Sequence, residues 1–287
     1  MNTLEIVSLV DNYVVHPRHS KRGLLGEHGL SFLISAYGKH MLFDLGRGLT
    51  IEGNLKLLGF NFDSIDNIIL SHGHSDHVGG LEEPLKFKEE VKVYVHPDIF
   101  KPKYRIEKEG EEPRLSNGFS KSKKEYEYMG AKFIFRTEKM NIEEHLNLIG
   151  PIIRAKPSDD LYMPTRYIKE NSNFIIDPFT DEQVLIINTS KGLVLILGCT
   201  HNGLENTVDQ VREIMNKERV YGIIGGLHLC DTEVQKQKEL ALWLKKLGVE
   251  FLVCGHCTGF EALVTLNQIL GNKIAINYVG KKTEITL

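Results

Sequence analysis

The sequence predicts a fold of the α/β class. Short apolar runs bounded by turn residues alternate with helical patterns along the 287 residues, and this alternation is typical of α/β architectures. Hydrophobic residues make up 41% of the chain and charged residues 25%, and both fractions are near the averages of globular proteins. One large α/β unit can have this length, so we expect a single domain over residues 1–287.

The first predicted elements are a hairpin, a helix and a buried strand. Leu30–Ala36 and His40–Phe43 are apolar runs with a short turn between them, so they should pair. A helix should follow at about Thr50 and end at Gly59, because glycine suits the position after a helix C-terminus. Asn67–Leu70 is then expected as a buried strand that runs directly into a group of histidines.

Two central segments lack a regular pattern. Residues 97–132 are dense in Lys, Arg and Glu without a sustained period, so we expect a charged insertion or lid there. Residues 151–183 contain four prolines, and we expect a loop that crosses between two halves of the domain.

Regular order returns at Val184. Apolar stripes at helical spacing predict helices between the later strands, and Thr258 with Glu261 predicts a capping box that opens a third helix. The domain is therefore expected to consist of two similar halves. The strands expected in the second half are Val184–Asn188, Gly192–Leu197, Val220–Ile224, Phe251–Val253 and Ile274–Tyr278.

The clearest chemical signal follows the first buried strand. His72, His74, Asp76 and His77 place three imidazoles and one carboxylate within six residues. In an extended backbone His72 and His74 point to the same side, so they can bind one cation together. Asp76 and His77 are adjacent, which suits a second cation beside the first, or a helix start. Imidazole and carboxylate ligands suit Zn²⁺, with Mn²⁺ and Fe²⁺ as alternatives.

The histidine run resembles the HxHxDH motif of the metallo-β-lactamase superfamily, and Phe43-Asp44-Leu45-Gly46 resembles that superfamily's upstream turn. The resemblance implies an αββα four-layer sandwich with metals along one edge. Further runs resemble a narrower branch, the 7,8-dihydropterin-6-yl-methyl-4-(β-D-ribofuranosyl)aminobenzene 5'-phosphate synthase-like proteins. These runs are Glu27-His28-Gly29-Leu30-Ser31, Gly198-Cys199-Thr200-His201-Asn202-Gly203, Gly225-Gly226-Leu227-His228-Leu229 and His256-Cys257-Thr258-Gly259.

The remaining metal ligands should come from the second half. His201 and His256 each follow a predicted strand and precede a helix, as the first cluster does. Most members of the superfamily carry a bridging Asp after the first of these strands, where this chain has Cys199. Its thiolate is a further candidate ligand, or Cys199 is a small buried residue. We assign one metal to His72, His74 and His201, and the other to Asp76, His77 and His256.

Other residues are candidates for catalysis and substrate binding beside the ligand Asp76. Asp44 should accept an N–H from a ligand histidine and fix its tautomer. His228 resembles the proton-donating histidine of phosphodiesterases in the superfamily, so it should bind a phosphoryl oxygen or protonate a leaving group. Glu27 and His28 are expected to shape the same pocket. Helix N-termini near the metal edge favour a small anionic or phosphorylated substrate.

Three functions follow from these features. The first is a metal-dependent hydrolase, in which metal-bound hydroxide attacks a phosphate ester, phosphodiester or acyl substrate. The second, implied by the branch resemblance, is a transferase that condenses a pterin pyrophosphate with an aminobenzene ribotide. The third is a redox or iron enzyme, because Cys254 and Cys257 have the spacing of a CxxC motif.

Charge and composition restrict the setting. The net charge of −3 supplies no overall attraction to nucleic acid. The N-terminal residues lack a secretory pattern, and no apolar stretch approaches the length of a membrane span, so we expect a cytoplasmic protein. Four cysteines are few for this length, which argues against a disulfide scaffold.

Overall fold

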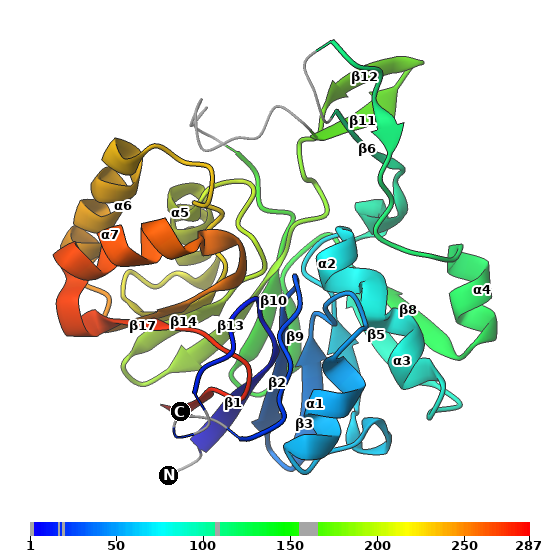
Figure 1. Ribbon diagram of the computed structural model, residues 1–287, viewed down its shortest axis with the longest axis horizontal. Coiled ribbons are helices and arrows are strands. Elements are labelled where there is room, and N and C mark those ends of the chain that lie inside the picture. The colour runs from blue at the N-terminus through cyan, green and yellow to red at the C-terminus, as the bar shows by residue number, and fades with distance from the viewer. Residues whose placement is uncertain (1–2, 17, 19–20, 107–109, 155–165) are drawn as a thin grey trace.

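Two large sheets lie face to face in the middle of the molecule, and helices cover the outer face of each, so the fold has four layers (Figure 1). The computed structural model describes residues 3–287 except 17, 19–20, 107–109 and 155–165. This is the layering that the resemblance implied.

The first sheet has the strand order β18-β1-β2-β3-β4-β5-β8. Strands β18, β1, β2 and β3 pair antiparallel, and β3, β4, β5 and β8 pair parallel. The predicted hairpin is confirmed as β2 and β3, and the predicted buried strand is β4. The bounds are β1 Thr3–Val10, β2 Ser31–Ala36, β3 Lys39–Phe43, β4 Asn67–Ile69, β5 Val91–Val95, β8 Ala131–Phe135 and β18 Lys282–Thr286.

The second sheet has the order β17-β16-β15-β14-β13-β10-β9, and its strands β14 to β17 run parallel. All the strands predicted after Val184 are present, each within two residues of its expected end. The bounds are β9 Met140–Glu143, β10 Leu146–Ile149, β13 Val184–Thr189, β14 Gly192–Ile196, β15 Val220–Gly225, β16 Phe251–Cys254 and β17 Ile274–Ile276.

The helices divide between the two outer faces (Figure 1). Helices α1 Ile51–Leu57, α2 Ser75–Val78, α3 Glu82–Leu85 and α4 Lys123–Tyr128 belong to the first sheet, and α5 Leu204–Met215, α6 Val234–Leu247 and α7 Phe260–Leu270 to the second. None of the helices in the described part of the chain has the length and apolar character needed to cross a membrane.

The predicted capping box before α7 is wrong. The N-cap of α7 is Gly259, which makes no side-chain cap hydrogen bond. The hydroxyl of Thr258 instead accepts a hydrogen bond from the backbone amide of Leu227 at 3.1 Å. Thr258 therefore joins the loop after β16 to the loop after β15, which a local sequence pattern cannot reveal.

Strands of the two sheets are buried on both faces, because each sheet separates two hydrophobic cores. In β2, Phe32 faces the core between the sheets, while Leu33 faces the core under α1. In β14, Val194 and Ile196 face the central core, while Leu195 packs with the helices α5 to α7. Such strands have continuous apolar sequences, which is why the short apolar runs identified them.

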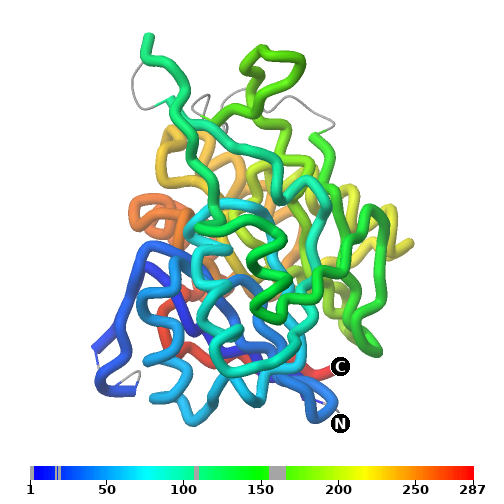
Figure 2. The backbone as a smooth tube through the Cα atoms, turned by 90° about the vertical axis from the view of Figure 1, so that its right-hand side faces the viewer, coloured from blue at the N-terminus to red at the C-terminus, as the bar shows by residue number. Residues whose placement is uncertain are grey.

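A third, four-stranded sheet has the order β12-β11-β6-β7. It consists of β6 Lys103–Arg105, β7 Arg114–Leu115, β11 Arg166–Glu170 and β12 Asn173–Ile176. Figures 1 and 2 show it beyond the ends of the two large sheets. Residues 151–183 are therefore more than the crossing loop expected, since 166–176 form a hairpin. Part of segment 97–132 stands apart in this sheet, whereas Tyr126 of α4 belongs to the core.

The core between the sheets should be sensitive to truncation. Phe32 is 1% exposed there, so Phe32→Ala should lower the free energy of unfolding by about 3–5 kcal/mol. Urea unfolding followed by circular dichroism measures this change. Leu49 is 78% exposed, and Leu49→Ala is the control that should leave the midpoint nearly unchanged. Equal midpoints for the two variants would contradict the assignment of Phe32 to the central core.

Candidate metal centre

The candidate metal ligands lie at one edge of the two large sheets, after strands that end there. The loop after β4 carries the histidine run, in which His74 is the N-cap of the short helix α2. His201 lies after β14, and His256 lies after β16 at the start of a 3₁₀ turn. Each sheet therefore contributes donors to the same edge, as expected for the carboxyl ends of parallel strands.

The first group consists of His72, His74 and His201. One ring nitrogen from each of them lies within 4.8 Å of the others. The Nε2 atoms of His72 and His201 are 3.2 Å apart, and the buried Nε2 of His74 has no hydrogen-bond partner among the described residues. The structure thus brings together the three residues that the sequence assigned to one metal.

The second group consists of Asp76, His77 and His256. The Oδ2 atom of Asp76 lies 3.4 Å from Nε2 of His256 and 3.9 Å from Nε2 of His77. The other ring nitrogen of His256, Nδ1, lies 3.0 Å from the side-chain oxygen of Asn12. Because Asn12 can accept only a proton on Nδ1, the Nε2 lone pair of His256 is left free to face Asp76.

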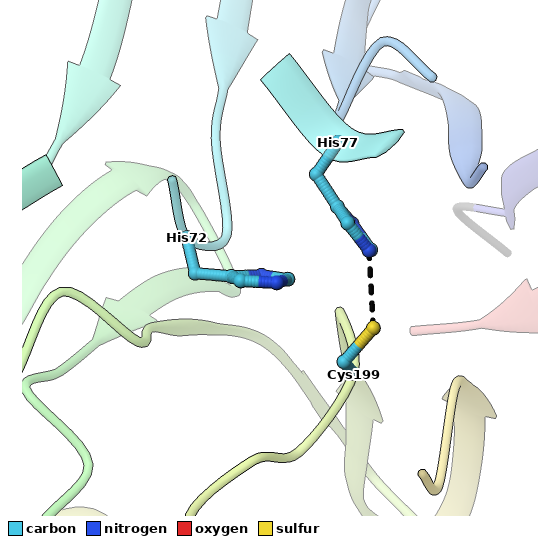
Figure 3. Close-up of side chains that lie close together, drawn as sticks. All are labelled: His72, His77 and Cys199. Carbon is cyan, nitrogen blue, oxygen red and sulfur yellow. Dashed lines mark hydrogen bonds between the residues drawn. The ribbon is translucent and has the colours of Figure 1, made fainter. Parts of the chain in front are cut away.

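Cys199 lies between the two groups. Its Sγ atom is 3.0 Å from Nε2 of His77, and Figure 3 shows the thiol directed at that ring with His72 alongside. The ligand atoms of His72, His77 and Cys199 all lie within 4.8 Å of one another. Cys199 therefore has the position that a bridging ligand requires, besides being a buried residue.

The Asp44 carboxylate holds the histidine run from below. Its Oδ2 atom lies 2.7 Å from Nδ1 of His77 and 2.7 Å from the hydroxyl of Ser71. Its Oδ1 atom accepts the backbone amide of Ser71 at 2.7 Å. The contact to His77 fixes the proton on Nδ1 and turns Nε2 toward Cys199, which is the orienting contact predicted for Asp44.

Burial and nearby charges set the protonation of the histidines. Burial lowers the pKa of His72, His74 and His201 well below the usual range, so their rings are neutral. Burial alone would lower the pKa of His77 also, but the Asp44 carboxylate raises it to about 9. Burial raises the pKa of Asp76, yet its contacts with His256 and His28 hold it well below the ordinary value.

These donors fit a divalent cation. Neutral imidazole nitrogens and an ionised carboxylate are the forms that coordinate metals. The Nε2 atoms of His74 and His256 are buried without a hydrogen-bond partner among the described residues, and such groups are costly unless something satisfies them. A cation in each group would provide the missing interaction. The mixed nitrogen, oxygen and sulfur donors are those of Zn²⁺ sites.

His228 lies beside the first group. Its ring centroid is 4.4 Å from that of His201, and its Nδ1 atom is buried without a hydrogen-bond partner in the described structure. Burial tends to lower the pKa of His228, but neighbouring Cys257 raises it above the usual value. His228 is thus placed at the wall of the site, in a form that can hold a proton.

The CxxC pair does not have the setting of a thiol exchange motif. Both Cys254 and Cys257 are free and buried, and burial raises the pKa of Cys254, whereas an exchange thiol needs access and a stabilised thiolate. The Cys257 sulfur instead forms a group with Cys199 and His228, whose ligand atoms lie within 4.8 Å of one another.

Glu27 and His28 have different positions. The two carboxylate oxygens of Glu27 accept backbone amides of Arg47 and Leu49 at 2.9 and 3.0 Å, so Glu27 shapes the turn after β3 and its expected role in binding substrate is a correction. His28 lies at the rim, with its side chain 58% exposed and its Nε2 atom 3.2 Å from Oδ2 of Asp76.

Several supporting residues were missed by the sequence analysis. The buried ammonium of Lys103 contacts Asp177 at 2.9 Å and Asp181 at 3.0 Å, and Asp181 also accepts the backbone amide of Gly73 at 2.7 Å. Glu182 accepts the backbone amide of His201 at 2.6 Å. The only available signal was an acidic pair at the end of a proline-rich segment, which does not specify such contacts.

The chain is similar to several known proteins. A family model described as anti-Pycsar protein Apyc1 matches residues 27–149. The 7,8-dihydropterin-6-methyl-4-(β-D-ribofuranosyl)-aminobenzene-5'-phosphate synthase of Methanocaldococcus jannaschii is 34% identical over 271 residues, which are 91% of this chain and 90% of that protein.

Solved structures share the fold. The crystal structure of Tm1679, a metal-dependent hydrolase of the β-lactamase superfamily, is 28% identical with a TM-score of 0.80 and covers 99% of this chain and 100% of its own. Zn²⁺-bound PqqB from Methylobacterium extorquens is 10% identical with a TM-score of 0.55, covering 98% of this chain and 100% of its own, and shows the likeness in fold alone.

The Asp44 contact should control metal affinity without being a ligand itself. Asp44→Asn keeps the size of the side chain but cannot hold the Nδ1 proton of His77 in the same way, so the affinity for Zn²⁺ should fall by about 10–100-fold. Competition with a chromophoric chelator measures it. Asp66 is exposed and accepts the amide of His40, and Asp66→Asn is the matched control. An unchanged affinity in Asp44→Asn would refute the role.

Proposed function

The chain belongs to the metallo-β-lactamase superfamily, in the family of the M. jannaschii synthase, and on that premise we propose that it is a metal-dependent hydrolase of a phosphate-containing substrate. The observation that carries the proposal is the convergence of His72, His74 and His201 beside Asp76, His77 and His256 at one sheet edge. Zn²⁺ is the proposed metal, as one or two ions, with Mn²⁺ or Fe²⁺ as alternatives.

The proposed roles follow the two groups. His72, His74 and His201 hold one ion, and Asp76, His77 and His256 hold the other, with Cys199 as a bridging ligand. When bound, such ions act as Lewis acids and activate water at neutral pH. Asp44 keeps His77 oriented, and the loop residues exclude bulk water, since five of the six proposed ligands are buried.

His228 is the proposed proton donor. Its ring packs beside that of His201, so it can reach a group held at the first ion. A protonated imidazole there can bind a phosphoryl oxygen or protonate a leaving group. His28, at the exposed rim beside Asp76, is proposed to contact the substrate as it enters.

An anionic substrate is supported by the helices at this edge. Helix α5 begins at Leu204, just after His201, and α7 begins at Phe260, just after the turn of His256. Helix N-termini carry partial positive charge and favour anions. The small anionic substrate, and a cytoplasmic setting in keeping with four free cysteines, belong to the same proposal.

A second candidate is the synthase reaction itself, favoured by the 34% identity to the M. jannaschii enzyme over most of both chains. In that reaction a pterin pyrophosphate would condense with an aminobenzene ribotide and release pyrophosphate. The same donors and His228 would then stabilise a leaving diphosphate instead of activating water. The two reactions differ in whether water enters a product.

Isotope labelling distinguishes the two reactions. With Zn²⁺-loaded protein and a phosphodiester such as bis(p-nitrophenyl) phosphate in H₂¹⁸O, we expect one ¹⁸O atom in the phosphate product, detected by mass spectrometry. A His74→Ala variant should lose this turnover. Release of pyrophosphate from a pterin pyrophosphate and an aminobenzene ribotide, with no hydrolysis of any phosphate ester, would instead establish the synthase reaction and reject the hydrolase.

The role of His228 predicts a dependence on the leaving group. His228→Ala should retain the metal content of the wild type but lower kcat for a poorly leaving alcohol by about 10² to 10⁴-fold. With p-nitrophenol, which leaves without protonation, kcat should fall much less. Steady-state kinetics and elemental analysis measure both effects. If metal content falls together with activity, His228 is a ligand and the assignment of a proton donor is rejected.

A further inference from the structure

The small sheet presents one face to the metal centre through Lys103 of β6. The ammonium of Lys103 is buried between Asp177 and Asp181, and Asp181 accepts the backbone amide of Gly73 at 2.7 Å, between the ligands His72 and His74. A Cβ on Gly73 would lie 3.2 Å from the side chain of Lys103. The side of β6 that carries Lys103 therefore points into the loop of the first ion.

Three arginines share that face. Side chains alternate along a strand, so Arg105 points to the same side as Lys103. Arg105 is paired in register with Arg166 of β11 and with Arg114 of β7, and directly opposed residues project from the same face of a sheet. Arg166, Arg105 and Arg114 thus form a row across three adjacent strands, which we call the arginine row.

The arginine row lies within electrostatic reach of the proposed ligands. Burial lowers the pKa of Arg166, and Asp76 and Cys199 act against this effect. After burial, the charge of Arg166 is the next cause of the lowered pKa of His74. Arg166, at the end of the row, is therefore the arginine nearest to the ions, and Arg105 and Arg114 extend outward from it.

The row has no counter-charge in the described structure. Like charges directly opposite each other on neighbouring strands are destabilising. Among the described residues, none of the three guanidinium groups makes a hydrogen bond or an ion pair, although Arg166 is partly buried. Neighbouring strands are about 4.8 Å apart, so the row offers three planar donors in a line of about 10 Å. A carboxylate-free line of arginines matches phosphate oxygens, which guanidinium binds in bidentate fashion.

We propose that the arginine row is a substrate subsite that binds a phosphate group of a small molecule other than the group that reacts at the metal ions. The inference rests on the proposed function for the location of the reacting group. It adds a second requirement to the substrate, which must carry a phosphate monoester or a diphosphate outside the bond that is changed. Recognition of that group would position the reacting bond between the ions and His228.

Binding of inorganic pyrophosphate to the Zn²⁺-loaded protein tests the row without any turnover. Isothermal titration should give a Kd that is about 10–100-fold weaker for Arg166→Gln and for Arg105→Gln than for the wild type, since each variant loses charged hydrogen bonds. Inorganic phosphate should show a smaller loss, because it reaches fewer guanidinium groups. Elemental analysis after each titration should show the same zinc content in all proteins.

The matched control lies on the same strand. Lys169 of β11 is three residues from Arg166 and projects from the opposite face, so Lys169→Gln should bind pyrophosphate as the wild type does. Equal weakening in Lys169→Gln would reduce the effect to general charge and overturn the subsite. Wild-type affinity in both arginine variants would overturn it as well.

Two further outcomes are separable from this one. If a single-stranded oligonucleotide binds more tightly than pyrophosphate and loses affinity in the same arginine variants, the row serves a nucleic acid and the small-molecule proposal is overturned. If the arginine variants lose pyrophosphate binding while the isotope experiment shows no hydrolysis, the subsite stands and the hydrolase proposal alone fails.

Discussion

The carboxylate of Asp44 is the contact on which the metal centre depends. It is completely buried, and it binds the amide and hydroxyl of Ser71 together with the ring of His77. One side chain from the end of β3 thereby fixes both ends of the loop that carries four proposed ligands. An uncompensated carboxylate in this position would be expensive to bury, so the loop and Asp44 stabilise each other in a single conformation.

The second half uses carboxylates in the same way. Asp181 accepts the amide of Gly73, and Glu182 accepts the amides of His201 and Asn202. Burial raises the pKa of Glu182 to about 7 despite these bonds. The donor loops of both sheets are thus held by side chains that bind their backbone, which leaves the imidazole nitrogens free for cations. Positioning of ligands by such outer contacts is a general property of metal sites.

Much of this arrangement could be predicted from local sequence, and the rest could not. The buried strands have apolar runs, and the HxHxDH run concentrates four donors in six residues, so both are local signals. The contact of Thr258 with Leu227 and the ion pairs of Lys103 join distant segments. The pairing of β6 with β11 depends on a register between residues some sixty positions apart, and a charged, irregular segment gives no local indication of it.

The division of ligands between two sheets has a consequence for how the protein assembles. His72 and His201 are 129 residues apart in the chain, and their strands belong to different sheets. Neither half can form the complete site before the central core has packed, so tight metal binding comes late in folding, and the cation acts as a clasp between halves that are already in place. Because a ligand bound only by the native state stabilises it, cellular metal supply would then regulate how long the assembled protein persists.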